Sequence, residues 1–315
     1  MKTKGIFIIR AAGCLLCGTV MLVATHARAQ YNFIPIDDPS ATEGTTPFGI
    51  DGNNIVGNYQ NSSGIFGFLY NGSSYTTLTF PSSLDTIASG ISGNNIVGYY
   101  NQNGFIYNIS TAGFTTLNNP AGANGITPGG ISGNHIVGTY WYGGGSGAGG
   151  FLYDISTASY TLLNVPSSLQ TFAYGIDGNN IVGSYYSSSD HDYGFLYNIS
   201  TGIYTTLNDP LGVDGTEARG VSGNHIVGYY FDNRNQYCGF LYDISTGSFT
   251  TLNDPLGVNG TGATGISGNH IVGFYSPSGG YSSGFEAMPV PEPSTAALTG
   301  LGAVGLLAYR RKSWI

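Results

Sequence analysis

Short hydrophobic runs alternate with polar junctions along most of the chain. The runs are rich in Ile, Val, Tyr, Phe and Thr, which favour strands, while Asn, Gly, Ser, Asp and Pro stand at the junctions. Between the two ends of the chain, no stretch shows the 3.6-residue period of an amphipathic helix. The pattern therefore predicts an all-β domain whose strands are mostly buried on both faces, with helix only at the ends.

One phrase recurs six times and organises this region. It reads Gly-Ile-Asp/Ser-Gly-Asn-Asn/His-Ile-Val-Gly, with small changes. Its copies start at Gly49, Gly90, Gly130, Gly175, Gly220 and Gly265. The starts lie roughly 40 to 45 residues apart, which is the period of a four-stranded propeller blade. The spacing therefore predicts a six-bladed β-propeller of four-stranded blades.

The fifth unit shows the strands expected in each blade. A hairpin joins Arg219–Ser222 to His225–Tyr230, and its tight turn holds Gly and Asn, which tolerate a positive φ. A variable polar stretch, Phe231–Tyr237, follows. Two more strands are then expected at Gly239–Ser245 and Ser248–Leu252.

The two ends of the repeat region predict ring closure. The sixth unit stops at Gly284–Ala287, without the strand that ends the other units. Phe33–Pro39, near the other end of the chain, aligns with Tyr204–Pro210 of a complete unit. We therefore expect the mature N-terminus to complete the last blade and leave no open edge. An open solenoid would instead need atypical capping repeats, and neither terminal unit is of that kind.

The repeats also resemble a known type. The phrase Gly-Ile-x-Gly-Asn-x-Ile-Val-Gly-x-Tyr, followed by Gly-Phe-Leu-Tyr, resembles the extracellular repeats of the HAF type, which are associated with propeller-like domains in bacterial surface proteins. Those repeats usually carry His-Ala-Phe where this chain has Gly-Phe. The resemblance implies the architecture and brings no active site with it.

The N-terminus has the pattern of a secretory signal peptide. Lys2, Lys4 and Arg10 precede the apolar segment Ala11–Thr25. Ala27 and Ala29 then supply the small residues that signal peptidase reads before Gln30, which predicts a signal peptide over residues 1–29. A lipoprotein site at Cys17 is the alternative, but Leu16 before it is larger than the usual pattern allows.

The C-terminus is tripartite. An apolar stretch over 295–309 separates a short motif from a basic end. The motif is Val290, Pro291, Glu292, Pro293 and Ser294, and the basic end is Arg310, Arg311 and Lys312. This tail, 289–315, resembles the PEP-CTERM sorting signal. That family is found in Gram-negative bacteria that make exopolysaccharide, and an exosortase, a membrane cysteine transpeptidase, processes it.

The length of the apolar stretch agrees with that resemblance. About 15 residues are fewer than the ~20 that usually span a bilayer, and the basic end favours the cytoplasmic side. The resemblance implies a transient transmembrane helix in the inner membrane, removal of the tail near Pro291–Pro293, and a final place at the cell surface or in the extracellular matrix. A permanent membrane helix is the alternative.

The charge of the region between the two signals excludes some partners. Tyr31–Met288 contains sixteen acidic residues and only two basic ones, Arg219 and Arg234. Nucleic acids are bound through clustered Lys and Arg, so we expect no nucleic-acid partner. Anionic membrane surfaces and acidic polysaccharides are disfavoured for the same reason.

A tyrosine follows each Ile-Val-Gly by two positions and offers a carbohydrate hypothesis. Aromatic rings beside polar side chains can stack on sugars. The same regularity also suits a core residue that the repeat requires, and the sequence leaves both interpretations open. The six residues are Tyr59, Tyr100, Tyr140, Tyr185, Tyr230 and Tyr275.

No metal, cofactor or catalytic site is predicted. Asn stands in three units where His stands in the other three, which favours hydrogen bonding over metal binding. The loop Asp190–Asp192, unique to the fourth unit, is a better candidate for adventitious metal binding, but no metal site is assigned to it. The loops Asp209–Thr216 and Asp254–Thr261 hold oxygen ligands that could bind calcium weakly, but turn formation explains them without an ion. The six residues at the Asn/His position are Asn54, Asn95, Asn180, His135, His225 and His270.

Enzymatic activity is the least favoured class. A propeller glycosidase needs converging carboxylates, and none of Glu43, Glu217 and Glu286 stands in a motif that breaks the repeat. Cys238, the one cysteine outside the signal peptide, is expected to be a half-buried thiol without a redox role. The sequence therefore predicts a secreted, non-catalytic structural or binding scaffold over residues 30–288. A carbohydrate-binding module of an exopolysaccharide matrix is the first alternative, and a glycoside hydrolase is the second.

Overall fold

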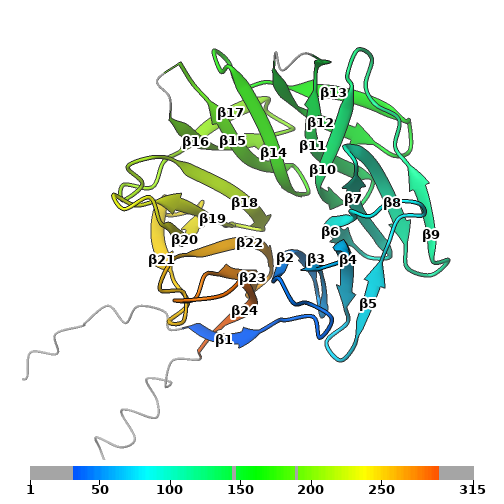
Figure 1. Cartoon of the computed structure of the whole chain (residues 1–315). Coiled ribbons are helices and arrows are strands. Elements are labelled where there is room, and N and C mark those ends of the chain that lie inside the picture. Colours follow the sequence, from blue (N-terminus) through cyan, green and yellow to red (C-terminus); the bar gives the residue numbers. More distant parts are fainter. Residues whose placement is uncertain (1–30, 144–146, 189–190, 291–315) are drawn as a thin grey trace, which may run out of the picture.

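A computed structural model describes residues 31–143, 147–188 and 191–290. In these ranges the chain forms 24 strands, arranged as six antiparallel four-stranded sheets around a central axis (Figure 1). The prediction of an all-β, six-bladed propeller with four-stranded blades is confirmed. In each blade the first-named strand below lies innermost and the last lies at the rim.

The first three blades are consecutive in the chain. Blade 1 comprises β2 (Thr45–Asp51), β3 (Asn54–Asn61), β4 (Gly64–Tyr70) and β5 (Tyr75–Leu78). Blade 2 comprises β6 (Ile87–Ser92), β7 (Asn95–Tyr100), β8 (Asn103–Asn108) and β9 (Gly113–Thr116). Blade 3 comprises β10 (Gly125–Ser132), β11 (His135–Trp141), β12 (Ala148–Asp154) and β13 (Ser159–Leu163).

The last three blades follow the same plan, except at the final strand. Blade 4 comprises β14 (Gln170–Asp177), β15 (Asn180–Tyr186), β16 (Asp192–Asn198) and β17 (Ile203–Leu207). Blade 5 comprises β18 (Thr216–Ser222), β19 (His225–Phe231), β20 (Tyr237–Asp243) and β21 (Ser248–Leu252). Blade 6 comprises β22 (Thr261–Ser267), β23 (His270–Tyr275), β24 (Ser283–Pro289) and β1 (Tyr31–Pro35).

Blade 6 contains strands from both ends of the described chain (Figure 1). Its outer strand, β1, runs antiparallel to β24, with Tyr31 opposite Pro289 and Pro35 opposite Phe285. The strand overlaps the segment Phe33–Pro39 that the alignment predicts, but it begins two residues earlier and ends four residues earlier. It ends there because the chain turns into the linker to blade 1 after Ile36, whose amide donates to the carbonyl oxygen of Gly284 at 2.9 Å.

The first glycine of each phrase lies where the innermost strands meet. A Cβ atom on Gly49 would lie 3.0 Å from the Cα of Gly90, and one on Gly220 would lie 3.0 Å from the Cα of Gly265. The contact from Gly265 back to the Cα of Gly49, at 3.2 Å, joins blade 6 to blade 1. Any side chain here would push neighbouring blades apart, which explains why all six copies begin with glycine.

The last glycine of each phrase accommodates a buried phenylalanine from the next strand. A Cβ on Gly183 would lie 1.9 Å from the carbonyl oxygen of Phe172 and 2.7 Å from the ring of Phe195. The six phenylalanines are fully buried. Hydrophobic clusters then join neighbouring blades, as where Val182 of blade 4 packs with Val221 of blade 5. The core is therefore a set of layers between blades.

The two faces of the ring differ in their connections. Because strands alternate in direction, the hairpin turns between strands one and two, such as Gly223–Asn224, lie on one face, which we call the turn face. The loops between strands two and three, and the linkers between blades, lie on the opposite loop face. Tyr31 and Pro289 are paired at the turn face, so both ends of the described chain leave there.

The two predicted targeting segments, the signal peptide over 1–29 and the helix over 295–309, lie outside the described residues. Within the described ranges, no helix has the length and apolar character that a membrane crossing requires.

Candidate functional site

A β-bulge in the innermost strand of every blade places one residue at the central channel. The strand register shifts by one residue just before the first glycine of the phrase, as between Ala218 and Gly220 in β18. A bulged residue is left out of the ladder and is re-aimed by the local bend. The six bulged residues are Phe48, Ser89, Gly129, Tyr174, Arg219 and Thr264.

These six residues all line one cavity of about 200 Å³ in the channel, to which all six blades contribute. The glycine that follows each of them does not change, whereas the bulged residue is different in every blade. Two of the bulged hydroxyls are held by backbone: the Oγ of Ser89 lies 2.5 Å from the carbonyl oxygen of Pro128, and Thr264 Oγ1 donates to that of Pro47 at 2.7 Å. The channel is thus where the repeat loses its regularity.

Arg219 is the charged member of this set. Its guanidinium carbon lies 3.9 Å from the ring centroid of Tyr174, across the boundary between blades 4 and 5. Its Nη2 donates to Glu217 Oε2 and to the hydroxyl of Tyr229, and that hydroxyl lies 3.1 Å from the same Glu217 oxygen. The Arg219 and Glu217 side chains are only 27% and 12% exposed. They form a largely buried ion pair in the channel wall, supported by two tyrosines.

Burial fixes the protonation states in this network. It raises the pKa of Tyr174 and that of Tyr229, so both phenols stay neutral. Burial alone would lower the pKa of Arg219, but the hydrogen bond to Tyr229 and the negative charge of Glu217 hold it above its ordinary value. Arg219 therefore stays charged. Its Nε is buried and has no hydrogen-bond partner among the described residues.

Asp192 extends the network at the start of β16. It forms an isolated parallel bridge with Gly215, two residues before Glu217. Burial, followed by the negative charge of Glu217, raises its pKa to about 6, and Arg219 opposes that shift. The carboxylate of Asp192 is thus influenced by the negative charge of Glu217, and Glu217 itself already forms an ion pair with Arg219.

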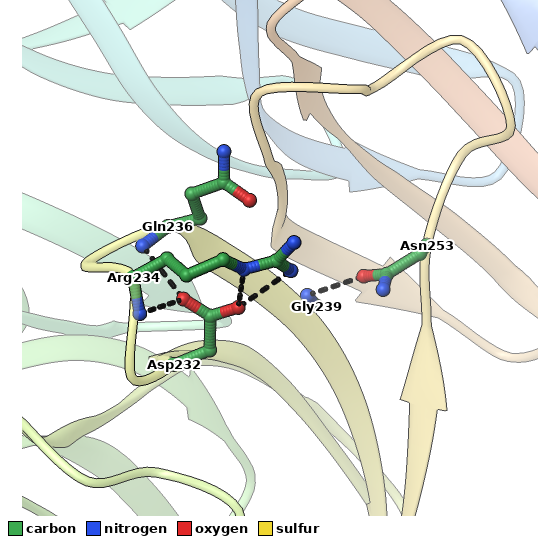
Figure 2. A network of polar contacts seen from close by, with 5 residues as sticks. All are labelled: Asp232, Arg234, Gln236, Gly239 and Asn253. Atoms are coloured by element: carbon green, nitrogen blue, oxygen red, sulfur yellow. Dashed lines mark hydrogen bonds and ion pairs between the residues drawn. The ribbon is translucent and has the colours of Figure 1, made fainter.

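The other arginine of the propeller has a local structural role (Figure 2). Arg234 lies in the loop between β19 and β20 and is 70% exposed. Its Nε and Nη2 both donate to Asp232 Oδ2, at 3.0 and 2.8 Å, while Asp232 Oδ1 accepts from the amides of Arg234 and Gln236 (Figure 2). Nearby, the amide of Gly239 donates to Asn253 Oδ1 at 3.2 Å. This arginine shapes its loop and does not line the channel cavity.

The six repeated tyrosines do not form a ring of exposed platforms. Tyr59, Tyr140, Tyr230 and Tyr275 are buried, with 3 to 8% of their surface exposed. Tyr100 and Tyr185 are half-buried, and Tyr100 stacks on Phe80 with 3.6 Å between ring centroids. The core interpretation fits these positions, because side chains two residues after the glycine point back between the blades. For four of the six, the ring faces are covered.

The Asn/His position forms pairs between the second and third strands of the blade. His135 Nε2 lies 3.5 Å from Asp154 Oδ2, and His270 Nδ1 lies 2.6 Å from Glu286 Oε1. In blades 2 and 4 Asn replaces His, and its partner on the third strand is then also Asn. In blade 4, for example, Asn198 Nδ2 donates a hydrogen bond of 3.0 Å to Asn180 Oδ1. Within the described residues, no group of three or more metal-ligating side chains occurs.

The acidic loops form turns. Asp209 Oδ1 accepts from the amide of Leu211 at 2.9 Å, and Asp254 Oδ1 accepts from that of Leu256 at 2.7 Å. Of the loop Asp190–Asp192, residue 190 lies outside the described residues.

Cys238 is half-buried, and burial raises the pKa of its thiol.

Glu217 and Arg219 stand at inner-strand positions that differ between blades: Thr216–Gly220 reads Thr-Glu-Ala-Arg-Gly, whereas the matching Thr261–Gly265 of blade 6 reads Thr-Gly-Ala-Thr-Gly. Sequence reasoning did not single out Arg219 as a site residue, because it compared the phrases and not the residues just before them. An alignment of the six units at the first glycine shows six different residues at the position just before it.

The comparisons with known proteins identify the tail and the fold. Residues 289–312 match the family model described as the PEP-CTERM protein-sorting motif. That motif implies export, transient membrane anchoring in bacteria and processing by an exosortase. No curated protein matches the chain. The resemblance of the repeats to the HAF type stays a prediction.

Among solved structures, TolB from Acinetobacter baumannii is 17% identical, with a TM-score of 0.53; the match covers 77% of this chain and 66% of that one, slightly less than two thirds of its length. A putative TolB from Agrobacterium tumefaciens is 16% identical with a TM-score of 0.51, covering 65% of this chain and 74% of that one. An acylaminoacyl peptidase from Pyrococcus horikoshii is 11% identical, with a TM-score of 0.47 and coverages of 79% and 46%. At these identities the first two likenesses show the fold alone.

Proposed function

We propose that this protein is a bacterial surface propeller that an exosortase sorts and that acts as a non-catalytic binding scaffold. The observation that carries the proposal is the position of the matched motif, which begins at Pro289, the last residue of β24. The sorting tail therefore follows the propeller without a spacer. Gram-negative origin and a final place at the cell surface or in an exopolysaccharide matrix belong to the same proposal.

Signal-peptide cleavage fits the same arrangement. Cleavage before Gln30 would leave one residue ahead of Tyr31, the first residue of β1. The mature N-terminus would then close the ring beside β24, next to the strand from which the tail departs. Removal of the signal peptide and of the tail would leave all six blades intact.

The loop face is the part of the propeller best placed to meet a partner. The tail leaves from the turn face, so an anchored propeller would turn its loop face away from the membrane. The inter-blade linkers on this face carry aliphatic side chains with more than half of their surface exposed, a feature of interaction surfaces. These are Leu84, Leu169, Leu211, Val213, Leu256 and Val258.

The placement of the glutamates supports a non-catalytic role. Glycoside hydrolysis needs two carboxylates that face a substrate together. Glu217 is committed to Arg219, Glu286 pairs with His270, and Glu43 accepts a hydrogen bond of 3.0 Å from Gln60. Each of these glutamates therefore already has a structural partner, and they lie in blade 5, in blade 6 and in the linker before blade 1.

The test is the intact mass and the cellular fraction of the protein in a producing bacterium, with and without its exosortase. The proposal expects a species shortened near Pro291–Ser294 outside the inner membrane, and its loss when the exosortase gene is deleted. A matched variant, Glu292→Ala in the motif, should block processing, whereas Glu43→Ala in the propeller should not. A full-length species that stays in the inner membrane in both strains would make the tail a permanent anchor and reject the proposal.

A further inference from the structure

We propose that the central channel at Arg219 is a binding site for one unit of a neutral, hydroxyl-rich ligand, of the chemical class of a sugar or polyol. The inference deepens the binding role proposed above and rests on it. It names a site that differs from the repeated tyrosines, most of which are buried.

The size of the cavity limits the ligand. A volume of about 200 Å³ corresponds to roughly six or seven water molecules at their liquid volume of ~30 Å³ each. Sites for larger organic ligands usually measure about 300 to 1,000 Å³. The channel therefore has room for a single small ring, and a longer chain would have to continue beyond it.

The charge of the cavity favours a neutral ligand. Among the described residues, Arg219 is the one charged residue in its lining, and Glu217 already neutralises it. An unpaired arginine would instead select a carboxylate or a phosphate. The excess of acidic residues over the whole propeller also repels anions from a distance.

The hydrogen-bonding groups of the channel suit hydroxyls, which both donate and accept. Of the N–H donors of Arg219, Nη2 is engaged by Glu217 and Tyr229, and the buried Nε has no partner among the described residues. The innermost strands β2, β6, β10, β14, β18 and β22 each pair on one side only, so their other backbone edges face the channel. Half-buried Tyr99 also lines the cavity and adds aromatic surface for the C–H face of a ring, whereas a face of the Tyr174 ring is already covered by Arg219.

A natural probe lies close to this site. Trp141 packs on Phe172 with 5.9 Å between ring centroids, and Phe172 is stacked on Tyr174 at 6.3 Å. The Arg219 guanidinium in turn lies over the ring of Tyr174. The other tryptophan of the chain is Trp314, in the tail. In a Trp314→Phe background the fluorescence of Trp141 therefore reports on the channel.

The variants can be taken from the repeat itself. The double change Glu217→Gly with Arg219→Thr gives β18 the inner-strand sequence of blade 6, Thr-Gly-Ala-Thr-Gly, which this fold already contains. Arg234→Thr removes the other arginine of the propeller, outside the channel, and is the matched control. If the double variant does not fold, Tyr99→Thr replaces it, because Thr139 holds the same position in blade 3 and also lines the cavity.

The experiment titrates the full-length protein in detergent with methyl glycosides of neutral hexoses, with glycerol and inositol, and with galacturonate and phosphate as anionic probes. We expect a saturable change in Trp141 fluorescence with at least one neutral compound. The double variant should bind it at least about tenfold more weakly, since hydrogen bonds to a charged donor are lost, and Arg234→Thr should bind it normally. Where Tyr99→Thr is used instead, it should also bind the compound more weakly, because the aromatic surface of Tyr99 is lost. Circular dichroism and thermal unfolding verify that each variant is folded.

Three results would overturn the inference: no saturable change with any neutral compound, binding of the anions alone, or full binding by a folded channel variant. None of them would affect exosortase processing, which the cell fractionation measures separately. Failure of this site and failure of the proposed function are thus distinguished.

Discussion

Ser267 Oγ accepts a hydrogen bond of 3.4 Å from the backbone amide of Gly52, although 215 positions separate the two residues. This contact joins blade 6 to blade 1 on the turn face. The equivalent residue of every other blade accepts from the turn glycine of the following blade in the same way. The pairs are Asp51 with Gly93, Ser92 with Gly133, Ser132 with Gly178, Asp177 with Gly223 and Ser222 with Gly268. The Asp/Ser position of the phrase thus supplies an acceptor that links each blade to the next.

The first prediction concerns one link of this ring. Asp177 Oδ2 accepts from the amide of Gly223 at 2.7 Å, so Asp177→Ala should lower the free energy of unfolding by about 1 kcal/mol. Asp177→Ser should retain most of the stability, because serine serves at this position in four other blades. Asp214→Ala, which removes an exposed carboxylate from a linker, is the control. Urea denaturation measures all three, and equal stability of the two alanine variants would contradict the role of the link.

The second prediction concerns the glycines that surround the channel. A Cβ on Gly175 would lie 2.7 Å from the carbonyl oxygen of Arg219. Gly175→Ala should therefore force blades 4 and 5 apart and destabilise the propeller by about 1 to 3 kcal/mol. Gly279→Ala, at an exposed loop position with no atom near the added carbon, should have little effect. The comparison is made by thermal unfolding, and an unchanged midpoint for Gly175→Ala would show that the inner strands tolerate a larger separation.

The third prediction is a pH dependence. The folded protein raises the pKa of Asp192 from 3.8 to about 6, so the folded state favours the protonated carboxyl. The stability that this group contributes is then present below pH 4 and is lost as pH rises from 4 to 6. Asp192→Asn should remove that loss and be more stable than the parent protein above pH 6. The measurement is the unfolding midpoint from pH 4 to pH 8, with Asp214→Asn as the control. If the midpoints of the parent and of Asp192→Asn changed with pH in parallel, the raised pKa of Asp192 in the folded protein would be refuted.

The repeat made much of this fold predictable from sequence, because each constant residue has one structural task. The turn glycine at Gly223 has a φ of 55°, and the first glycine of each phrase lies where two backbones approach closely. Residues that differ from one unit to the next give no such indication of their structural role. Arg219, Glu217 and Tyr174 meet because a bulge re-aims one side chain and because two blades come together, and neither event can be read from a single unit.

The repeated tyrosines give the last prediction, because their burial differs although their position in the phrase is the same. Tyr230 is 4% exposed and packs in the cluster that contains Phe240, whereas Tyr185 is half-buried and its hydroxyl lies 3.2 Å from Thr206 Oγ1. Tyr230→Ala should cost about 3 kcal/mol or more of unfolding free energy, the usual effect of removing a buried aromatic ring, and Tyr185→Ala should cost clearly less. Urea denaturation gives both values, and Tyr230→Phe controls for the loss of the hydroxyl alone. If Tyr230→Ala proved as stable as the parent protein, this tyrosine would not be a core residue, and the carbohydrate hypothesis for the tyrosine positions would regain its basis.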